Sequence, residues 1–388
     1  MPWRTTDVSE QRAQFVIRAD SGKEVMAELC REFSVSRNTG YRWLKRYRET
    51  GSISGLMEFS RRPHHSPRKT SAALEQQVLE LRERYGWGAR KLATVLRQRN
   101  VMVPVVTTHR ILERHGHIAK EDSHRPALHR FERAEPNQLW QMDAKAEYRF
   151  PGGKCFPLTL LDDCSRYLVG LHALPRFRSE TVHDALVHTF RECGVPEAML
   201  MDHGIQWWNS QNARGVTWLT IALIKQGIKI YYSGICHPQT QGKVERLHRT
   251  LKESIVFRGG PPATWTRWPP VLADFRDEYN HIRPHQALNM ATPASRYRSS
   301  PRCYQECPPE WEYPNGAELR RVPANGMLRD RDCEWFVSQA LVGEQVCLEH
   351  LSDRILVIYR DMYWQEVDRA TGQTWPLVLP VAEGRQES

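Results

Sequence analysis

The sequence has no long hydrophobic run and no secretory signal. Among its 388 residues, no uninterrupted apolar segment approaches the ~18 residues that a membrane-spanning helix requires. The first residues are polar and lack the charged, apolar and small-residue regions of a signal peptide. We therefore expect a soluble, cytoplasmic protein that has no membrane partner.

Cysteine is sparse and irregularly placed. The chain has 9 cysteines, an odd number scattered along its length. Cys303 and Cys307 form a lone C-x-x-x-C pair, and no second pair lies at a spacing that would complete a zinc site. We expect no disulfide framework, and the thiols should be reduced.

The N-terminal third is short of acidic residues. Residues 1–134 hold 26 Lys and Arg against 15 Asp and Glu, a net charge of +11, whereas the remainder of the chain carries −1. The excess positive charge is therefore confined to one region. An anionic polymer such as nucleic acid is the natural partner of such a region.

The pattern of residues 22–50 predicts a helix, a turn and a second helix. Val25, Leu29 and Phe33 recur on one helical stripe, Ser36 can cap a helix from about residue 37 to residue 49, and Gly51 ends it. Basic and amide side chains cluster on the second helix, as in a helix-turn-helix recognition helix. A small helical bundle with a basic surface remains the alternative. The candidate DNA-binding residues here are Arg37, Asn38, Arg42, Lys45 and Arg46.

A second module of the same kind follows a basic linker. We assign residues 1–58 to the first module, 59–70 to the linker, 71–120 to the second module and 121–136 to a second linker. In the second module Leu74, Val78 and Leu81 mark one helix, and further helices are expected at 90–99 and 107–115. The candidate DNA-binding residues of its last helix are Thr107, His109 and Arg110. Two tandem modules imply a long duplex-DNA site.

From residue 137 strands and helices alternate, which predicts an α/β core over 137–300. Two short predicted strands end in acids, Asp143 and Asp202. In α/β sheets functional groups collect at strand ends. A predicted helix then carries Glu245, with Val244, Leu247 and Leu251 forming its apolar stripe.

Three carboxylates in these settings would suit divalent cations. Two Asp on adjacent strands and one Glu from a facing helix can hold two ions for phosphodiester chemistry. Simpler interpretations stay open, because a strand-end Asp often caps a turn and Glu245 could pair with Arg249 on a solvated helix. Asp162 and Asp163 are the strongest competitors for a metal-binding role.

Several segments resemble one known family. They are Trp140–Asp143, Leu161–Tyr167, Met201–Gly204 and His237–Leu251, and the segment Tyr279–Leu288 with Thr292-Pro293 resembles the end of the same core. Together they resemble DDE transposases of bacterial insertion sequences, within the retroviral-integrase superfamily. The resemblance spans about residues 20–375.

The resemblance implies an RNase H-like fold and assigns Asp143, Asp202 and Glu245 as the acid triad that binds Mg²⁺ or Mn²⁺. It leaves Asp162 and Asp163 out of the ligand set, and Lys243 and Arg249 are candidates to contact DNA phosphates. It also implies a homo-multimer that brings element ends together on target DNA. His203 departs from the family's usual Asn, and the last two acids are 43 positions apart, which exceeds the spacing of retroviral integrases.

After residue 301 the pattern becomes short and alternating. Five candidate strands occupy residues 319–322, 335–337, 345–348, 355–359 and 363–367, and Asn325-Gly326 is a turn signal. Five short strands predict a small β-barrel over 301–388. Prolines 261, 262, 269 and 270 are expected to break the preceding core.

The whole pattern predicts a DNA transposase that acts near the nucleoid of a bacterium. It would cleave element ends and join the 3′-hydroxyl to target DNA by two-metal transesterification. A DNA-binding regulator with an inactive integrase-like core is the alternative, and a nuclease acting on RNA–DNA hybrids is a third. The acid triad favours the first, because an inactive core has no need of it.

Overall fold

The computed structural model describes residues 8–57, 70–118, 132–145, 147–201, 208–209, 215–232, 242–331 and 333–381. The chain forms two compact units, Met1–Ser71 and Ala72–Ser388. Of the predicted linkers, 59–70 lies outside the described residues except for residue 70, and 121–136 is described only from residue 132. Every described cysteine is a free thiol. None of the described helices is long and apolar enough to cross a membrane.

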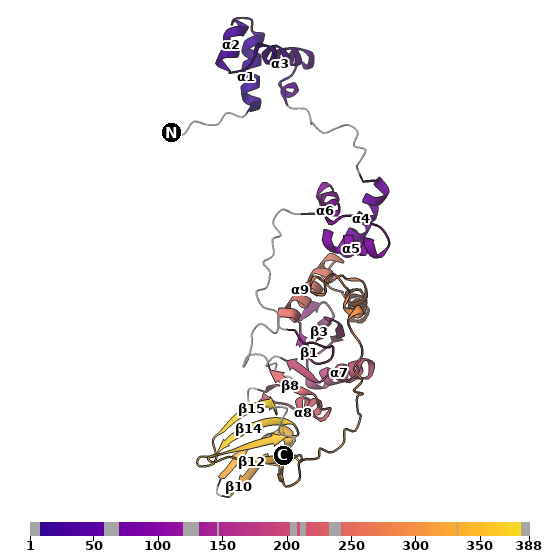
Figure 1. The fold of residues 1–388 in the computed structure, drawn as a ribbon, viewed down its shortest axis with the longest axis vertical. Helices are drawn as coiled ribbons and strands as arrows, with labels where there is room; N and C mark the ends of the chain where they lie inside the picture. The colour runs from indigo at the N-terminus through magenta and orange to yellow at the C-terminus, as the bar shows by residue number, and fades with distance from the viewer. Residues whose placement is uncertain are drawn as a thin grey trace. The chain divides into compact units, whose positions relative to one another are not determined.

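The first unit is a helical module of α1 (Val8–Asp20), α2 (Met26–Glu32), α3 (Arg37–Thr50) and a short 3₁₀ helix, Ile53–Leu56 (Figure 1). The predicted ends of α3 are confirmed. The Ser36 side chain accepts a hydrogen bond from the Thr39 amide, and Gly51 ends the helix at a φ of 62°. A Cβ on Gly40 would lie 2.8 Å from atoms of Phe15 and Cys30, so α3 packs closely on its neighbours. Helix α1 was not predicted.

The second unit begins with three helices, α4 (Ala72–Tyr85), α5 (Ala89–Gln98) and α6 (Val105–Arg114), as predicted. Their common core includes Leu81, Leu92 and Ile111. This module packs on the rest of the unit, because Ile282 joins its core and the Arg283 guanidinium lies 5.6 Å from the Trp87 ring centroid.

A mixed sheet forms the centre of the second unit. Its main strands are β1 (Trp140–Ala144), β3 (Gly153–Asp162), β4 (Leu168–Leu174), β5 (Ala198–Met201) and β8 (Lys229–Tyr232). Their order is β4-β3-β1-β5-β8, and the short strand β2 (Tyr148–Phe150) also pairs with β3. Strands β3 and β4 run antiparallel to their neighbours, whereas β1, β5 and β8 are parallel. A separate small hairpin consists of β6 (Trp208–Asn209) and β7 (Gly215–Val216).

Helices cover both faces of this sheet. Helices α7 (Ser179–Cys193) and α8 (Trp218–Lys225) share one hydrophobic cluster with it, and α9 (Gly242–Phe257) and α10 (Trp268–Asp277) share another. In Figure 1, α9 and α7 accordingly lie on opposite sides of β1 and β3. Pro269 and Pro270 were expected to break the core. Instead they open α10, where a proline's missing N–H is not needed.

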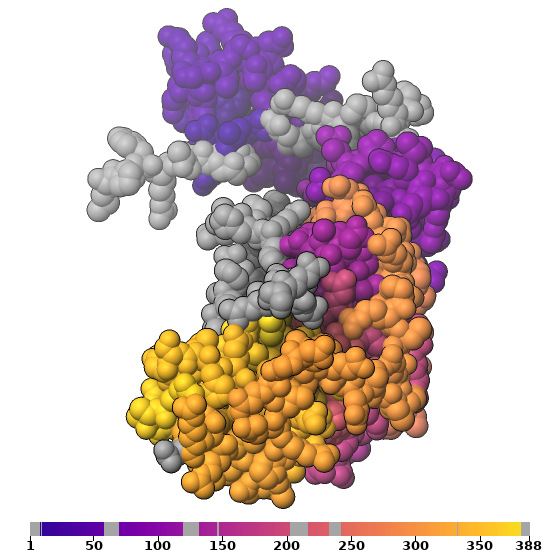
Figure 2. Space-filling model, turned by 60° about the horizontal axis from the view of Figure 1, so that its bottom comes forward, coloured from indigo at the N-terminus to yellow at the C-terminus, as the bar shows by residue number. Residues whose placement is uncertain are grey.

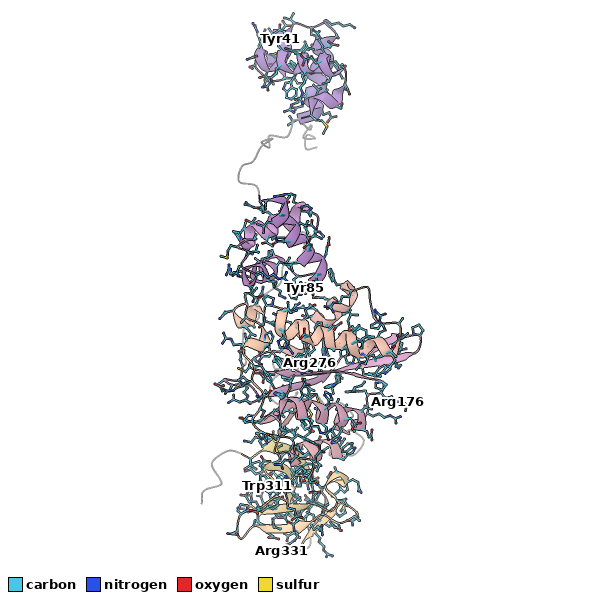
Figure 3. The ribbon with its side chains drawn as sticks, turned by 90° about the vertical axis from the view of Figure 1, so that its right-hand side faces the viewer. Tyr41, Tyr85, Arg176, Arg276, Trp311 and Arg331 are labelled. Atoms are coloured by element: carbon cyan, nitrogen blue, oxygen red, sulfur yellow. The ribbon has the colours of Figure 1, made fainter. Side chains whose placement is uncertain are left out.

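A one-turn π-helix, Glu278–Ile282, extends α10 and forms hydrogen bonds to strand β4. Asn280 is buried, its amide donates to the Leu168 carbonyl at 3.0 Å, and its oxygen accepts from the Leu168 amide at 2.8 Å. Arg276, labelled in Figure 3, donates to the same carbonyl and to the Glu192 carboxylate of α7. The end of β4 is thus held by side chains from α10 and its extension.

The C-terminal region is an antiparallel sheet with a separate hairpin. The five sheet strands, in the order β15-β14-β13-β12-β9, are β9 (Glu318–Arg321), β12 (Gln345–His350), β13 (Arg354–Tyr359), β14 (Met362–Asp368) and β15 (Thr374–Pro380). Strands β10 (Met327–Asp330) and β11 (Cys333–Phe336) form the hairpin. The strand pattern of the sequence predicted a barrel, but the described strands do not close into one. The sheet shares a hydrophobic cluster with the central core, and Figure 2 shows the two in direct contact.

Candidate active site

Two neighbouring strands place Asp143 and Thr159 on the α9 side of the sheet. Asp143 pairs with Thr159 in the β1–β3 register. The residue before each, Met142 and Leu158, belongs to the cluster on the α7 side. Because side chains alternate along a strand, Asp143 and Thr159 face the opposite side, where α9 packs. The Asp143 side chain is 24% exposed.

His248 of α9 joins these two residues. Its Nε2 lies 2.9 Å from the Thr159 hydroxyl, which in turn donates to the Asp143 carbonyl at 2.8 Å. The other ring nitrogen, Nδ1, is 3.6 Å from Asp143 Oδ2. The imidazole is buried, and burial together with the Lys145 charge lowers its pKa to about 4. At neutral pH the ring is therefore uncharged.

Two lysines add positive charge around Asp143. Burial and the Lys252 charge lower the pKa of Lys145, and the Asp143 carboxylate opposes that shift. Lys252 lies on α9, one turn beyond His248. Lys145, Lys252 and Asp143 are thus electrostatically coupled, and a developing negative charge at this edge of the sheet would be stabilised.

Glu245 is exposed on α9, one turn before His248. The predicted apolar stripe of that helix is confirmed, because Val244, Leu247 and Leu251 are buried. Asp202 comes directly after β5, which is parallel to β1 and next to it. The ends of β1 and β5 therefore meet at the same edge of the sheet. Asp202 itself lies outside the described residues, so the assembly of the triad stays a prediction.

Asp162 and Asp163, the other acids considered for a metal-binding role, accept hydrogen bonds from neighbouring parts of the fold. Asp162 accepts from the Asn137 amide at 2.7 Å and from the Ser165 amide and hydroxyl. Asp163 accepts from the Arg133 amide at 2.8 Å and the Gln141 side chain at 2.6 Å, and it forms an ion pair with Lys243. Both carboxylates are fully buried and lie in the interior, where they stabilise the β3–β4 turn.

The two phosphate-contact candidates on α9 differ in their surroundings. Lys243 is paired with Asp163, its side chain is 15% exposed, and burial lowers its pKa. Arg249 is exposed and lies 3.9 Å from Glu253 on the next turn. Arg249 is therefore accessible to a ligand, whereas Lys243 would have to leave a buried partner. DNA contact by either stays a prediction.

The DNA-binding candidates of the helical modules are mostly exposed. Arg37, Asn38, Arg42 and Lys45 on α3 and His109 and Arg110 on α6 are exposed, and Thr107 is half-buried. Arg46 differs, because it donates to the Met57 carbonyl and its guanidinium lies 5.0 Å from the Trp43 ring centroid. It therefore contributes to the fold of the first module.

A second cluster of possible metal ligands lies in the C-terminal region. Within the described part of the chain, only Glu318, Asp330 and His350 bring three ligand atoms within 4.8 Å of one another. Arginines already neutralise this cluster. Arg369 donates to His350 Nδ1 at 3.1 Å, and Arg320 forms an ion pair with Glu318.

Thr159, His248 and Lys145 were not predicted from the sequence as members of the site. His248 could have been found, since it lies three residues after Glu245 and therefore on the same helical face. Thr159 offered no such signal, because its contact with Asp143 depends on a cross-strand register.

Protein-family models match the helical N-terminal region and the central sheet region of the chain. Models described as an integrase core domain match residues 133–238 and 226–293. A helix-turn-helix domain matches residues 11–63, and a homeodomain-like domain matches residues 39–112. The integrase matches therefore include β1, Asp143 and α9 with Glu245.

The chain is similar to two curated proteins. It is 23% identical over 276 residues to an uncharacterized 31.7 kDa protein of insertion element IS407 from Burkholderia multivorans, covering 67% of this chain and 94% of that protein. It is 23% identical over 324 residues to the transposase for transposon Tn552 from Staphylococcus aureus, covering 72% of this chain. The chain spans 64% of that transposase's length.

Two solved structures are also similar in part. The HTLV-2 integrase catalytic core domain in complex with magnesium has a TM-score of 0.31 and 16% identity, covering 42% of this chain and 97% of that one. An intasome of simian T-cell lymphotropic virus bound to the PP2A subunit B56 gamma has a TM-score of 0.38 and 14% identity, covering 78% and 96%.

Proposed function

Since the chain contains an integrase core domain preceded by helix-turn-helix domains, we propose that it is a DNA transposase. It cleaves the ends of a mobile element and joins each 3′-hydroxyl to target DNA by transesterification. The proposal is supported above all by the position of Asp143 at the edge of the sheet. Contacts of His248 with Thr159 and Asp143 join this edge to α9. The strand order β4-β3-β1-β5-β8 supports an RNase H-like core.

Asp143, Asp202 and Glu245 would hold the divalent ions of this reaction, Mg²⁺ or Mn²⁺. The donor set fits, because carboxylate oxygens are the ligands that both ions accept. When bound, the ions activate the attacking hydroxyl and stabilise the leaving oxygen. The chain's own contribution is to fix Asp143 at the end of β1 and to present Glu245 on the helix that His248 holds against β1 and β3.

Duplex DNA is the substrate, both as the terminal inverted repeats and as the target. The exposed basic side chains of α3 and α6 bind it, together with Arg249 near the reacting phosphate. Lys145 and Lys252 would stabilise charge that develops near Asp143. The active form is a homo-multimer that holds two element ends together.

The experiment is a strand-transfer assay on a plasmid that carries the DNA flanking this gene. Wild type should nick and join these ends in Mg²⁺. Asp202→Asn and Glu245→Gln should each reduce joining at least about a hundredfold, because each removes a charged ligand. Glu253→Gln is the matched control, since Glu253 lies on the same helix and is exposed.

Wild-type joining by either triad variant would refute the assignment of the acids. Tight binding to the flanking DNA, with no cleavage in Mg²⁺ or Mn²⁺, would identify a DNA-binding regulator with an inactive core instead.

A further inference from the structure

Helix α6 buries one face in the second module and leaves the opposite face exposed. Thr108, Ile111 and Leu112 are the buried side chains, and their spacing marks one side of a helix. At the C-terminal end of α6, Arg114 forms an ion pair with Glu75 of α4. Contacts on the buried side therefore fix the direction in which the exposed face points.

The exposed face of α6 begins with apolar side chains. Val106 is 61% exposed, Val105 is 40% exposed, and Met102, just before the helix, is 73% exposed. His109 and Arg110 are also exposed and lie one turn after Val106 on the same face. Apolar side chains that gather at one end of an exposed helix face indicate a surface that another molecule covers.

Helix α3 of the first module has a different chemistry at the equivalent positions. Its first two residues are Arg37 and Asn38, where α6 has Val105 and Val106. One turn later both helices carry an exposed arginine at the same position. Each is the second helix of a helix-turn-helix, so its N-terminal residues face base edges in a major groove. Arginine and asparagine can donate hydrogen bonds there, whereas valine can only make apolar contacts.

Duplex DNA suits the exposed face of α6 better than a second copy of the chain does. The major groove contains one kind of apolar group, the C5 methyl of thymine. The first turn of α6 has no acidic residue, so the positive end of the helix dipole and Arg110 favour a polyanion. Three apolar side chains are too few for the roughly 800 Å² that each partner buries in a stable dimer.

We infer that Val106 determines part of the DNA sequence specificity by packing against the C5 methyl group of a thymine in the major groove. Met102 and Val105 exclude water from this contact. The inference rests on the proposed function, in which duplex DNA is the substrate. The two modules then differ in what they recognise, because α3 supplies charge and hydrogen bonds and α6 reads a methyl group. The contact made by Val106 should be insensitive to salt, since it displaces no counterion.

The test replaces single thymines of the DNA that flanks this gene by deoxyuridine, which removes only the C5 methyl group. Binding of the full chain is measured by fluorescence anisotropy. Wild type should lose about fourfold in affinity at one or two thymine positions, the effect expected of one buried methyl group. Val106→Ala should bind unmodified DNA about fourfold more weakly or worse, and should not respond to deoxyuridine at a position where wild type does.

Two further variants provide controls. Val8→Ala shortens another exposed valine, at the start of α1, and should keep the wild-type affinity and the wild-type response to deoxyuridine. Arg42→Ala should reduce the slope of log affinity against log salt concentration by about 0.9, because one phosphate contact is lost. Val106→Ala should leave that slope unchanged. Since Val106 is exposed, its variant should also unfold at the wild-type temperature.

An equal response to deoxyuridine in wild type and Val106→Ala would overturn the inference, as would no response in wild type or a lower salt slope in Val106→Ala. Altered self-association of Val106→Ala without DNA, measured by sedimentation, would overturn it too and identify an interface between copies. If any of these results accompanies strand transfer that still requires Glu245, the inference fails while the proposed function stands. If wild type binds none of the flanking DNA, both fail.

Discussion

At the scale of single residues, surroundings separate acids that look equivalent in the sequence. Asp163 is fully buried among donors, whereas Asp143 sits partly exposed at a strand end. Asp163 already accepts from Arg133, Gln141 and Lys243, so its oxygens serve the fold and its negative charge is balanced by a buried ammonium. Its removal should therefore damage the fold, and the removal of Asp143 should damage the chemistry.

A pair of isosteric variants separates these roles. Asp163→Asn leaves the Lys243 ammonium buried without its countercharge, so unfolding by urea should show a loss of about 3 kcal/mol or more. Asp143→Asn should change stability by less than about 1 kcal/mol, because its side chain is partly exposed, and should abolish strand transfer. Equal destabilisation by the two variants would contradict this assignment.

Two half-buried histidines predict a loss of stability in acid. Burial lowers the pKa of His172 to about 4 and that of His285 to about 3. At these two histidines, the unfolded chain binds protons near pH 6.5 and the folded chain does not. The free energy of unfolding therefore keeps its full value above pH 6.5 and decreases as pH falls toward 4.

Urea unfolding between pH 7.5 and 4.5 would measure this effect. His285→Gln should reduce the number of protons taken up on unfolding by about one. The slope of the unfolding free energy against pH should decrease correspondingly. An unchanged slope would mean that His285 is already protonated in the folded chain.

At the scale of elements, the sequence predicted the segments whose side chains alternate or recur regularly. The helices at Arg37, Ala72 and Ala89 and the strands around Asp143 and Met201 were all found this way. Helix α1 was missed because its apolar face is weakly patterned, with Phe15, Val16 and Ala19 as its buried side chains. Strand β10 was missed because it has only one buried side chain, Leu328.

The candidate site was predictable only in part, for a similar reason. Asp143 was predicted from its position at a strand end, and Glu245 from the periodic pattern of its helix. Both patterns can be recognised within a short segment of sequence. The contact between Thr159 and His248 joins residues 89 positions apart. It depends on the register of β1 with β3 and on which face α9 covers, and neither follows from local pattern.

Asn280 offers a test of how the π-helix holds the edge of the sheet. Asn280→Ala would leave the buried amide of Leu168 without a partner and its carbonyl with Arg276 alone, at a cost of about 1–3 kcal/mol in urea unfolding. Asn280→Asp keeps the acceptor but loses the donor, and should fall between alanine and wild type. Equal effects of the two variants would show that the pair of hydrogen bonds does not act as described.

At the scale of the molecule, the two helical modules differ in how they relate to the central sheet. The first module has its own hydrophobic core, which includes Phe15, Leu29, Leu44 and Leu56. The second module instead shares a unit with the integrase core and contacts it through Trp87 and Ile282. The first unit should therefore unfold independently, and the second module should unfold with the core.

Calorimetry of the full chain and of two fragments checks this expectation. Residues 1–71 alone should give one transition, and residues 72–388 should give the other with its midpoint shifted by less than about 2 °C, because each unit has a hydrophobic core of its own. Compared with the full chain, the fragment 72–388 should also bind the DNA that flanks the gene more weakly and with a shallower salt dependence, because it lacks the basic side chains of α3. A core transition that falls by ten degrees or more without the first unit would show that the two units stabilise each other.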